Sequence, residues 1–214
     1  MRTINQIGFA AAMLIATVEA VPCKALAMSG GSNRGAWEIG VLWGLAHYGT
    51  PEDYYYDVVS GVSAGAINTA GTAGWAPEEI LEMTEYLSQA WLDLTSPDVW
   101  TMRPDLIKVP LGEKSLLDDS PLLETIREIM AVRSDFARRV SVATVDLNSG
   151  EYTEFNQKTT SYYDFGQASM ASGSIPGAFP PMPFVGGNFV DGGTVWNVNI
   201  DSALNQCYEM GATT

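Results

Sequence analysis

Histidine is almost absent from this chain, since His47 is the single example in 214 residues. A serine nucleophile usually relies on a histidine base, so a Ser–His–Asp triad would depend on that one residue. His47 stands near the end of a predicted helix, where a structural role is common. One histidine and no Cys-x-x-Cys pair also leave no cluster of metal ligands. The sequence therefore predicts no metal and no other cofactor.

Basic residues are also scarce, because 11 lysines and arginines stand against 25 aspartates and glutamates, for a net charge of −14. Nucleic-acid-binding proteins need a basic surface, and anionic membranes attract basic segments, so neither partner is expected. Any transient contact with a lipid surface must then depend on exposed aromatic and aliphatic side chains. Hydrophobic residues make up 46% of the chain and charged residues 17%, which is typical of a globular protein. The length suits one α/β domain.

Only two cysteines are present, Cys23 and Cys207. A secretory route would permit a disulfide between them, provided that their Cα atoms lie within about 7 Å of each other. Two buried free thiols are the alternative, and the sequence does not choose between them.

The first residues resemble a targeting segment. Arg2 precedes an apolar run at residues 7–16, and Val18-Glu19-Ala20 fits a signal-peptidase site. The apolar run is too short to span a bilayer, which takes about 20 helical residues. We predict a signal peptide at residues 1–20 and an acyl hydrolase domain at residues 21–214, in the secretory pathway or outside the cell. A buried amphipathic helix is the alternative reading of the first segment.

A candidate nucleophile lies in Gly61-Val62-Ser63-Ala64-Gly65, a G-x-S-x-G motif. An apolar run precedes the motif and a run of small residues follows it, which is the strand, turn and helix order of a nucleophile elbow. Asp191-Gly192-Gly193 supplies a carboxylate after another apolar run. Because histidine is scarce, the two motifs favour a Ser63–Asp191 dyad in which aspartate is the base.

A glycine-rich loop precedes both motifs, between a predicted strand at residues 24–28 and a predicted helix at residues 36–47. Free N–H groups at the start of a helix can bind a phosphate or an oxyanion. The loop lacks the Lys-Ser/Thr ending of a Walker loop, and beside a G-x-S-x-G the oxyanion role is favoured. The candidate residues are Gly30, Gly31, Ser32, Asn33, Arg34 and Gly35. Arg34 fits either a contact with the loop or a lipid phosphate, or a surface salt bridge.

In this order the motifs resemble those of the patatin-like phospholipase family, which are G-G-G-x-R/K-G, G-x-S-x-G and D-G-G/A. Residues 171–181 also resemble the family's A-S-x-x-I-P-x-x-F-P-P segment. The resemblance covers about residues 24–200 and implies a metal-free lipid acyl hydrolase, with Ser63 as nucleophile and Asp191 as base. Two departures stand out. Ser32 replaces the third loop glycine, which restricts the backbone if that position needs positive φ, and the chain ends where family members continue.

Alternating strand and helix patterns predict an α/β fold, with a mainly parallel sheet and helices on both faces. The resemblance implies a patatin-like three-layer sandwich, shortened at the C-terminus. The helix at residues 36–47 is apolar almost all round, so we expect it to be buried, with Gly40 and Gly44 allowing close packing on the sheet. Trp91, Trp100 and Met102 are expected either to line an acyl pocket or to pack in the core.

Three hypotheses about function follow. The first is a hydrolase that cleaves fatty acids from phospholipids or related glycerolipids. The second is a short-chain carboxylesterase, which differs in its chain-length preference. The third is a truncated, inactive patatin-like protein that binds lipid, although such a protein would have no chemical need for both Ser63 and Asp191.

Overall fold

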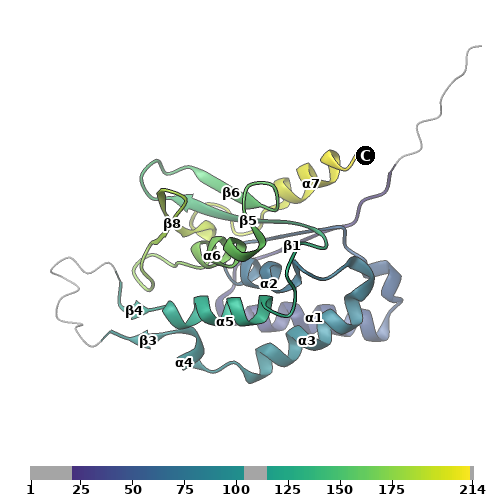
Figure 1. The fold of residues 1–214 in the computed structure, drawn as a ribbon, viewed down its shortest axis with the longest axis horizontal. Coiled ribbons are helices and arrows are strands. Elements are labelled where there is room, and N and C mark those ends of the chain that lie inside the picture. The colour runs from purple at the N-terminus through teal and green to yellow at the C-terminus, as the bar shows by residue number, and fades with distance from the viewer. Residues whose placement is uncertain (1–20, 104–114, 213–214) are drawn as a thin grey trace, which may run out of the picture.

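The computed structural model describes residues 21–103 and 115–212 (Figure 1). The predicted signal peptide lies outside these residues. A six-stranded sheet forms the centre of the fold. Its strands are β1 (Ala25–Met28), β2 (Val58–Gly61), β5 (Arg139–Asp146), β6 (Tyr152–Asn156), β7 (Met182–Phe184) and β8 (Gly187–Asp191). A separate pair is formed by β3 (Thr101–Met102) and β4 (Leu117–Asp118).

Strand β5 organises the sheet, because it pairs with three other strands. Along one edge it pairs with β6, in the hairpin that the sequence predicts around Asn148-Ser149-Gly150. Along the other edge it pairs first with β2, in parallel, and then with β8, antiparallel. β1, β2 and β5 are the parallel part of the sheet, and β6, β7 and β8 extend it antiparallel.

Helices cover both faces of the sheet, as expected for a three-layer α/β sandwich. The helices are α1 (Gly35–Tyr48), α2 (Ala64–Thr72), α3 (Ile80–Asp93), α4 (Ser96–Val99), α5 (Ser120–Met130), α6 (Tyr162–Ser172) and α7 (Ile200–Glu209). Figure 1 shows α7 on one side of the strands, with α2 and α6 on the other side and α1, α3 and α5 beyond them. None of the helices in the described part of the chain is long and apolar enough to cross a bilayer.

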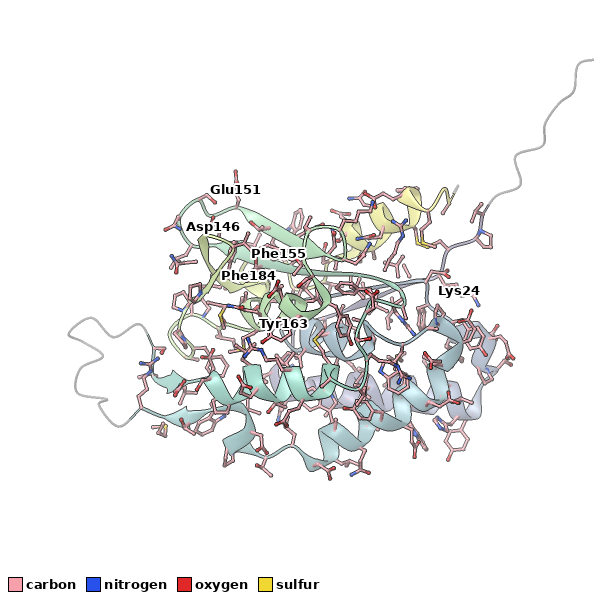
Figure 2. The ribbon with its side chains drawn as sticks, in the orientation of Figure 1. Lys24, Asp146, Glu151, Phe155, Tyr163 and Phe184 are labelled. Carbon is pink, nitrogen blue, oxygen red and sulfur yellow. A yellow bond between two sulfur atoms is a disulfide. The ribbon has the colours of Figure 1, made fainter. Side chains whose placement is uncertain are left out.

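Apolar strand residues form the core between the layers. Val58, Val59 and Val140 are fully buried, as expected for central strands with both faces covered. Phe155 of β6 packs edge-to-face against Phe184 of β7, across β5 and β8, with ring centroids 5.0 Å apart (Figure 2). This aromatic contact joins β6 to β7 on the side of the sheet that faces α6.

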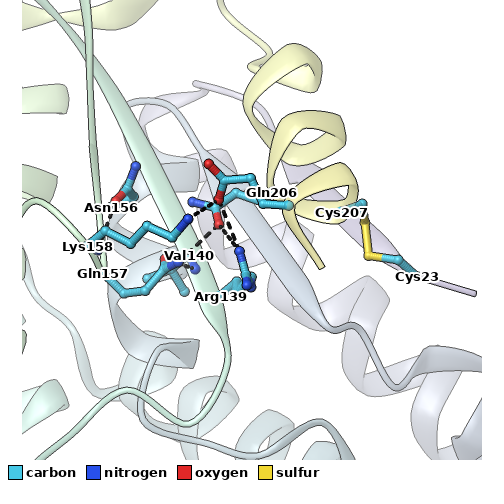
Figure 3. A network of polar contacts seen from close by, with 9 residues as sticks. Cys23, Arg139, Val140, Asn156, Gln157, Lys158, Gln206 and Cys207 are labelled. Atoms are coloured by element: carbon cyan, nitrogen blue, oxygen red, sulfur yellow. Dashed lines mark hydrogen bonds and ion pairs between the residues drawn. A yellow bond between two sulfur atoms is a disulfide. The ribbon is translucent and has the colours of Figure 1, made fainter. Parts of the chain in front are cut away.

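Helix α7 is fastened to the sheet by a disulfide and a polar network (Figure 3). Cys23 and Cys207 form the disulfide, with their Cα atoms 5.7 Å apart, so the structure decides between the two alternatives that the sequence leaves open. Gln206 accepts hydrogen bonds from Arg139 and Gln157, at 3.3 and 3.0 Å. These contacts tie α7, the last described helix, to the residues before β1, to β5 and to the turn after β6, and the helix packs on β1, β2 and β5.

The prediction that α1 is buried all round is wrong. Its inner face packs against α2 and α3, but Trp37, Val41 and Leu45 on its outer face are exposed, and Trp37 retains 71% of its accessible surface. A Cβ added at Gly40 or Gly44 would meet nothing within 4 Å, so these glycines do not serve close packing. The reason is the position of α1: α2 separates it from the sheet, so only one of its faces is covered.

Candidate active site

Ser63 lies at the sharp turn between β2 and α2, with φ 54° and ψ −121°. This backbone conformation is strained for a residue with a side chain. The flanking glycines are required by close contacts. A Cβ at Gly61 would clash with the Gly65 carbonyl, and one at Gly65 would lie 2.5 Å from the Met28 carbonyl oxygen. The local sequence therefore builds the strand, sharp turn and helix that its motif predicts.

The elbow is braced from below by Ser172 at the end of α6. The Ser63 N–H donates to Ser172 Oγ at 2.8 Å, and Ser172 Oγ donates to the Ala143 carbonyl of β5 at 2.6 Å. Ser172 is fully buried. It thus connects the strained turn to the central strand through one hydroxyl group.

Asp191 ends β8 beside this turn, with 5% of its surface exposed. Its Oδ1 accepts the Gly193 N–H at 2.7 Å. Burial raises the pKa of the carboxyl group above its usual value, and hydrogen bonds from the Ser63 side chain and the Gly193 amide oppose that rise. Ser63 and Asp191 are 128 residues apart in the sequence, and the fold brings their side chains together.

The glycine loop lies against Ser63. A Cβ at Gly30 would come within 3.0 Å of the Ser63 Cβ. The Gly30 N–H is already donated to the Asn197 carbonyl, and the N–H of Arg34 to the Gly31 carbonyl. Within residues 21–103 and 115–212, the N–H groups of Gly31, Ser32, Asn33 and Ala64 have no bonded acceptor. Ala64 directly follows Ser63, a position whose N–H commonly contributes to an oxyanion hole, and the three loop amides are the candidates for the second donor, with Gly31 next to Gly30.

Ser32 occupies the third glycine position of the loop with φ 54°. That is the left-handed region, which glycine adopts without steric cost and other residues adopt rarely. The third position of the loop therefore does need positive φ, the condition under which the sequence predicts a restricted backbone at Ser32. Ser32 adopts this conformation at some cost in strain.

A polar network fixes the loop to the helices around it. Glu38 of α1 accepts hydrogen bonds from the Ser29 N–H and from Asn68 Nδ2, at 2.9 and 3.1 Å. Asn68 Nδ2 also donates to the Gly35 carbonyl, and Asn68 Oδ1 accepts from Trp91 Nε1 at 2.8 Å. Burial raises the pKa of Glu38, while its hydrogen bonds from Ser29 and Asn68 lower it. The loop is thus held at both ends by side chains of α1 and α2.

A cavity of about 630 Å³ opens from Ser63 between the helices. Its size is typical of a small-molecule site. Apolar side chains dominate the lining: they include Ile67, Leu87, Trp91, Leu94, Val99, Trp100, Leu117, Leu122, Ile129, Ile175 and Phe179. Trp91 and Trp100 therefore line the cavity, whereas Met102 does not belong to the lining and is exposed.

Two other candidates can now be placed. Arg34 is exposed and forms no ion pair with the residues that the structure describes, so the salt-bridge alternative is not observed there. His47 Nδ1 bonds with the Trp43 carbonyl at 2.9 Å, and His47 Nε2 lies 3.5 Å from Glu85. His47 is not part of the cavity lining.

The match to a known protein family agrees with the motifs of the sequence. A family model described as Patatin-like phospholipase matches residues 26–204. The chain belongs to the patatin-like phospholipase family. The resemblance seen in the motifs is thereby confirmed. No curated protein sequence matches the chain.

Two solved structures are similar to this patatin-like chain. VipD from Legionella pneumophila is 16% identical, with 84% of this chain and 47% of VipD covered and a TM-score of 0.47. A chain in the ExoU–SpcU complex of the Pseudomonas aeruginosa type III secretion system is 20% identical, with 74% and 37% covered and a TM-score of 0.44. The chain therefore spans less than half the length of either structure.

The sequence analysis missed several residues of this patatin-like site. Asn197, Ser172 and Asn68 bond to the backbone of the loop or of the elbow. Each is a small polar residue that could equally well be on the surface, and each reaches its partner across the fold. Glu38 could have been found from the sequence, because it is the only acidic or basic residue among the mainly apolar residues 36–46 of the predicted helix.

Proposed function

We propose that this chain is a lipid acyl hydrolase that cleaves ester-linked fatty acids from phospholipids or related glycerolipids. The observation that carries the proposal is the hydrogen bond between Asp191 and Ser63, because Ser63 also lines an apolar cavity. Membership of the patatin-like phospholipase family supports the same reaction class. The proposed reaction proceeds by acyl transfer through an acyl-enzyme.

In the first step, Ser63 Oγ attacks the ester carbonyl carbon while Asp191 accepts the hydroxyl proton. The carbonyl oxygen becomes an oxyanion that the Gly31 and Ala64 N–H groups stabilise. The tetrahedral intermediate collapses, and the alcohol leaves with the proton from Asp191. In the second step, Asp191 takes a proton from water, and the resulting hydroxide attacks the acyl-enzyme. That intermediate collapses, the bond between the acyl carbon and Ser63 Oγ breaks, and Asp191 returns its proton to Ser63 Oγ as the fatty acid leaves.

The environment of Asp191 suits the role of base. A carboxylate with an ordinary pKa is a weak base at neutral pH, and efficiency improves as the pKa approaches the working pH. Burial raises the pKa of Asp191, while the Gly193 amide keeps the ionised form bound in one orientation. Asp191 is therefore a stronger base than an exposed aspartate and remains directed at Ser63.

The cavity favours long acyl chains over the short-chain esterase alternative. Its aliphatic and aromatic lining offers apolar contacts well beyond those that a butyryl group needs. Burial of each methylene contributes about 0.8 kcal/mol, so a longer chain binds more tightly for as long as the cavity accommodates it.

We also propose a transient contact with a lipid surface outside the cell or in the secretory pathway. The outer face of α1 carries exposed Trp37, Val41 and Leu45 and no charged side chain among them. Ala36, at the start of that helix, also lines the cavity. An uncharged face on a protein of net charge −14 suits zwitterionic or neutral lipid better than anionic lipid. The disulfide fits an oxidising compartment.

Hydrolysis of two substrates tests the proposal. The chain is assayed on p-nitrophenyl butyrate and on vesicles of a long-chain zwitterionic phospholipid, beside Ser63→Ala and Asp191→Asn, with folding checked by circular dichroism. We expect both variants to lose activity while folded, and the wild type to prefer the long-chain substrate. Preference for butyrate would favour the esterase, and a folded wild type without activity on either ester would favour the lipid-binding alternative.

A further inference from the structure

Asn197 holds the glycine loop through two hydrogen bonds to a single residue. The Gly30 N–H donates to the Asn197 carbonyl at 3.0 Å, and Asn197 Nδ2 donates to the Gly30 carbonyl at 2.9 Å. The partners are 167 residues apart in the sequence. Both backbone polar groups of Gly30 are therefore satisfied by one asparagine that follows the aspartate motif.

The side-chain carbonyl of Asn197 fits between two glycines. A Cβ at Gly30 would clash with Asn197 Oδ1, and a Cβ at Gly193 would lie 2.6 Å from the same atom. Gly193 is the residue whose N–H binds Asp191 Oδ1. The side-chain amide of Asn197 thus packs against Gly30 of the loop on one side. On the other side it packs against Gly193, which binds the proposed base, Asp191.

We infer that Asn197 is a positioning residue, which fixes the glycine loop to the turn at Asp191-Gly192-Gly193. It thereby holds the oxyanion amides in place relative to Ser63 and Asp191. The inference rests on the proposed function. Asn197 acts through Gly30, which lies against the Ser63 Cβ, and through Gly193, which orients Asp191. Its effect is on alignment, and misplacement by about 1 Å can reduce a rate by about 100-fold.

Asn197→Ala removes the side-chain donor and the packing between the two glycines. We expect kcat to fall by about 100-fold, with KM changed less than about threefold, because alignment matters in the transition state more than in substrate binding. The acid limb of the kcat/KM profile should also move to higher pH. The Gly193 hydrogen bond lowers the pKa of Asp191, and a loosened bond lowers it less.

Burial raises the pKa of Tyr152 of β6 above its usual value, and the charges of Glu154, Asp191 and Asp201 raise it further. Tyr152 therefore stays neutral throughout the acid limb, and its hydroxyl donates to the Trp196 carbonyl. A shift of the acid limb reports on Asp191, and a purely structural loss of stability would leave it in place.

Asn156→Ala is the matched control, because the Asn156 side chain also bonds to backbone, accepting the Lys158 N–H at 2.9 Å in an exposed turn. We expect its kcat and acid limb to match the wild type. Asn197→Asp serves if Asn197→Ala does not fold: it keeps the shape, loses the donor to Gly30 and adds charge near Asp191. The kcat of Asn197→Asp should fall, and the acid limb of its kcat/KM profile should move to higher pH because the added charge disfavours ionised Asp191.

Wild-type kcat and an unmoved acid limb in the folded Asn197 variants would overturn the inference while leaving the proposed function intact. If the wild type hydrolyses no ester, the proposed function fails by itself. The inference is then decided by amide hydrogen exchange of Gly30 followed by NMR. Exchange at least tenfold faster in Asn197→Ala than in Asn156→Ala supports the lock, and equal exchange overturns it.

Discussion

Ser172 is the residue on which the strained elbow depends most directly. Its hydroxyl accepts the Ser63 N–H and donates to the Ala143 carbonyl, and it is fully buried. Ser172→Ala removes both bonds with the loss of a single oxygen atom. The two backbone groups are then left in a site too closed for water to replace that oxygen freely.

The magnitude follows from these two groups. An orphaned buried N–H costs about 1–3 kcal/mol, and a lost neutral hydrogen bond about 1 kcal/mol. We therefore expect Ser172→Ala to lower the free energy of unfolding by about 2–4 kcal/mol. For a domain of this size, each kcal/mol lowers Tm by about 2–4 °C. Turnover should fall as well, because the Ser63 backbone is no longer fixed.

Ser174→Ala is the control for this change. Ser174 is fully buried too, but its hydroxyl makes one bond, to the Met170 carbonyl, which also accepts the Gly173 N–H. Its loss orphans no backbone group and should cost less than about 1 kcal/mol. Urea unfolding followed by tryptophan fluorescence compares the two variants. Equal losses of stability would refute the account of the elbow.

Three further predictions concern the base, the disulfide and the exposed face. Because burial raises the pKa of Asp191, the acid limb of the kcat/KM profile should have its midpoint above about pH 4, the ordinary pKa range of an aspartate. The fold also disfavours the ionised form, so Asp191→Asn should be more stable than the wild type at pH 7, and this difference should vanish below about pH 4; a constant difference in urea midpoint would contradict it. Reduction of the Cys23–Cys207 disulfide releases a cross-link between residues 184 apart in the sequence and should lower the free energy of unfolding by about 5 kcal/mol. The loss is measured as a lower urea midpoint in dithiothreitol. An unchanged midpoint would show that α7 does not need the covalent link. Trp37→Ser should slow hydrolysis of zwitterionic vesicles several-fold and spare butyrate turnover, while Tyr163→Ser, which is equally exposed at 71%, should change neither rate; an equal loss in both variants would argue against a lipid contact at α1.

Sequence alone was sufficient for the parts of the fold that local chemistry determines. The G-x-S-x-G predicts its turn because Gly61 and Gly65 meet backbone at distances that no side chain tolerates. The β5–β6 hairpin follows from alternation and a turn with Gly150 at φ 75°. In each case the information lies within a few residues of the element that it specifies.

Helix α1 shows where this reasoning stops. Its sequence is apolar on several faces, and burial was the natural expectation. Which face is covered depends on the order of the layers, because α1 lies over α2 and α3 and not on the sheet. Trp37 and Leu45 then remain at the surface, and nothing in their local pattern distinguishes them from Ile39 and Leu42, which are buried.

The meeting of Ser63 with Asp191 is decided by the edge of a single strand. β6 occupies one edge of β5, so β2 and β8 must share the other. β2 pairs up to Val142 and β8 begins its pairing at Thr144, with Asp191 opposite. Two strands that run in opposite directions therefore end against each other, and the residues that follow or close them are forced together. The motifs supply the two side chains, but only this shared edge makes them neighbours, because two segments about 130 residues apart in the sequence both pair with β5.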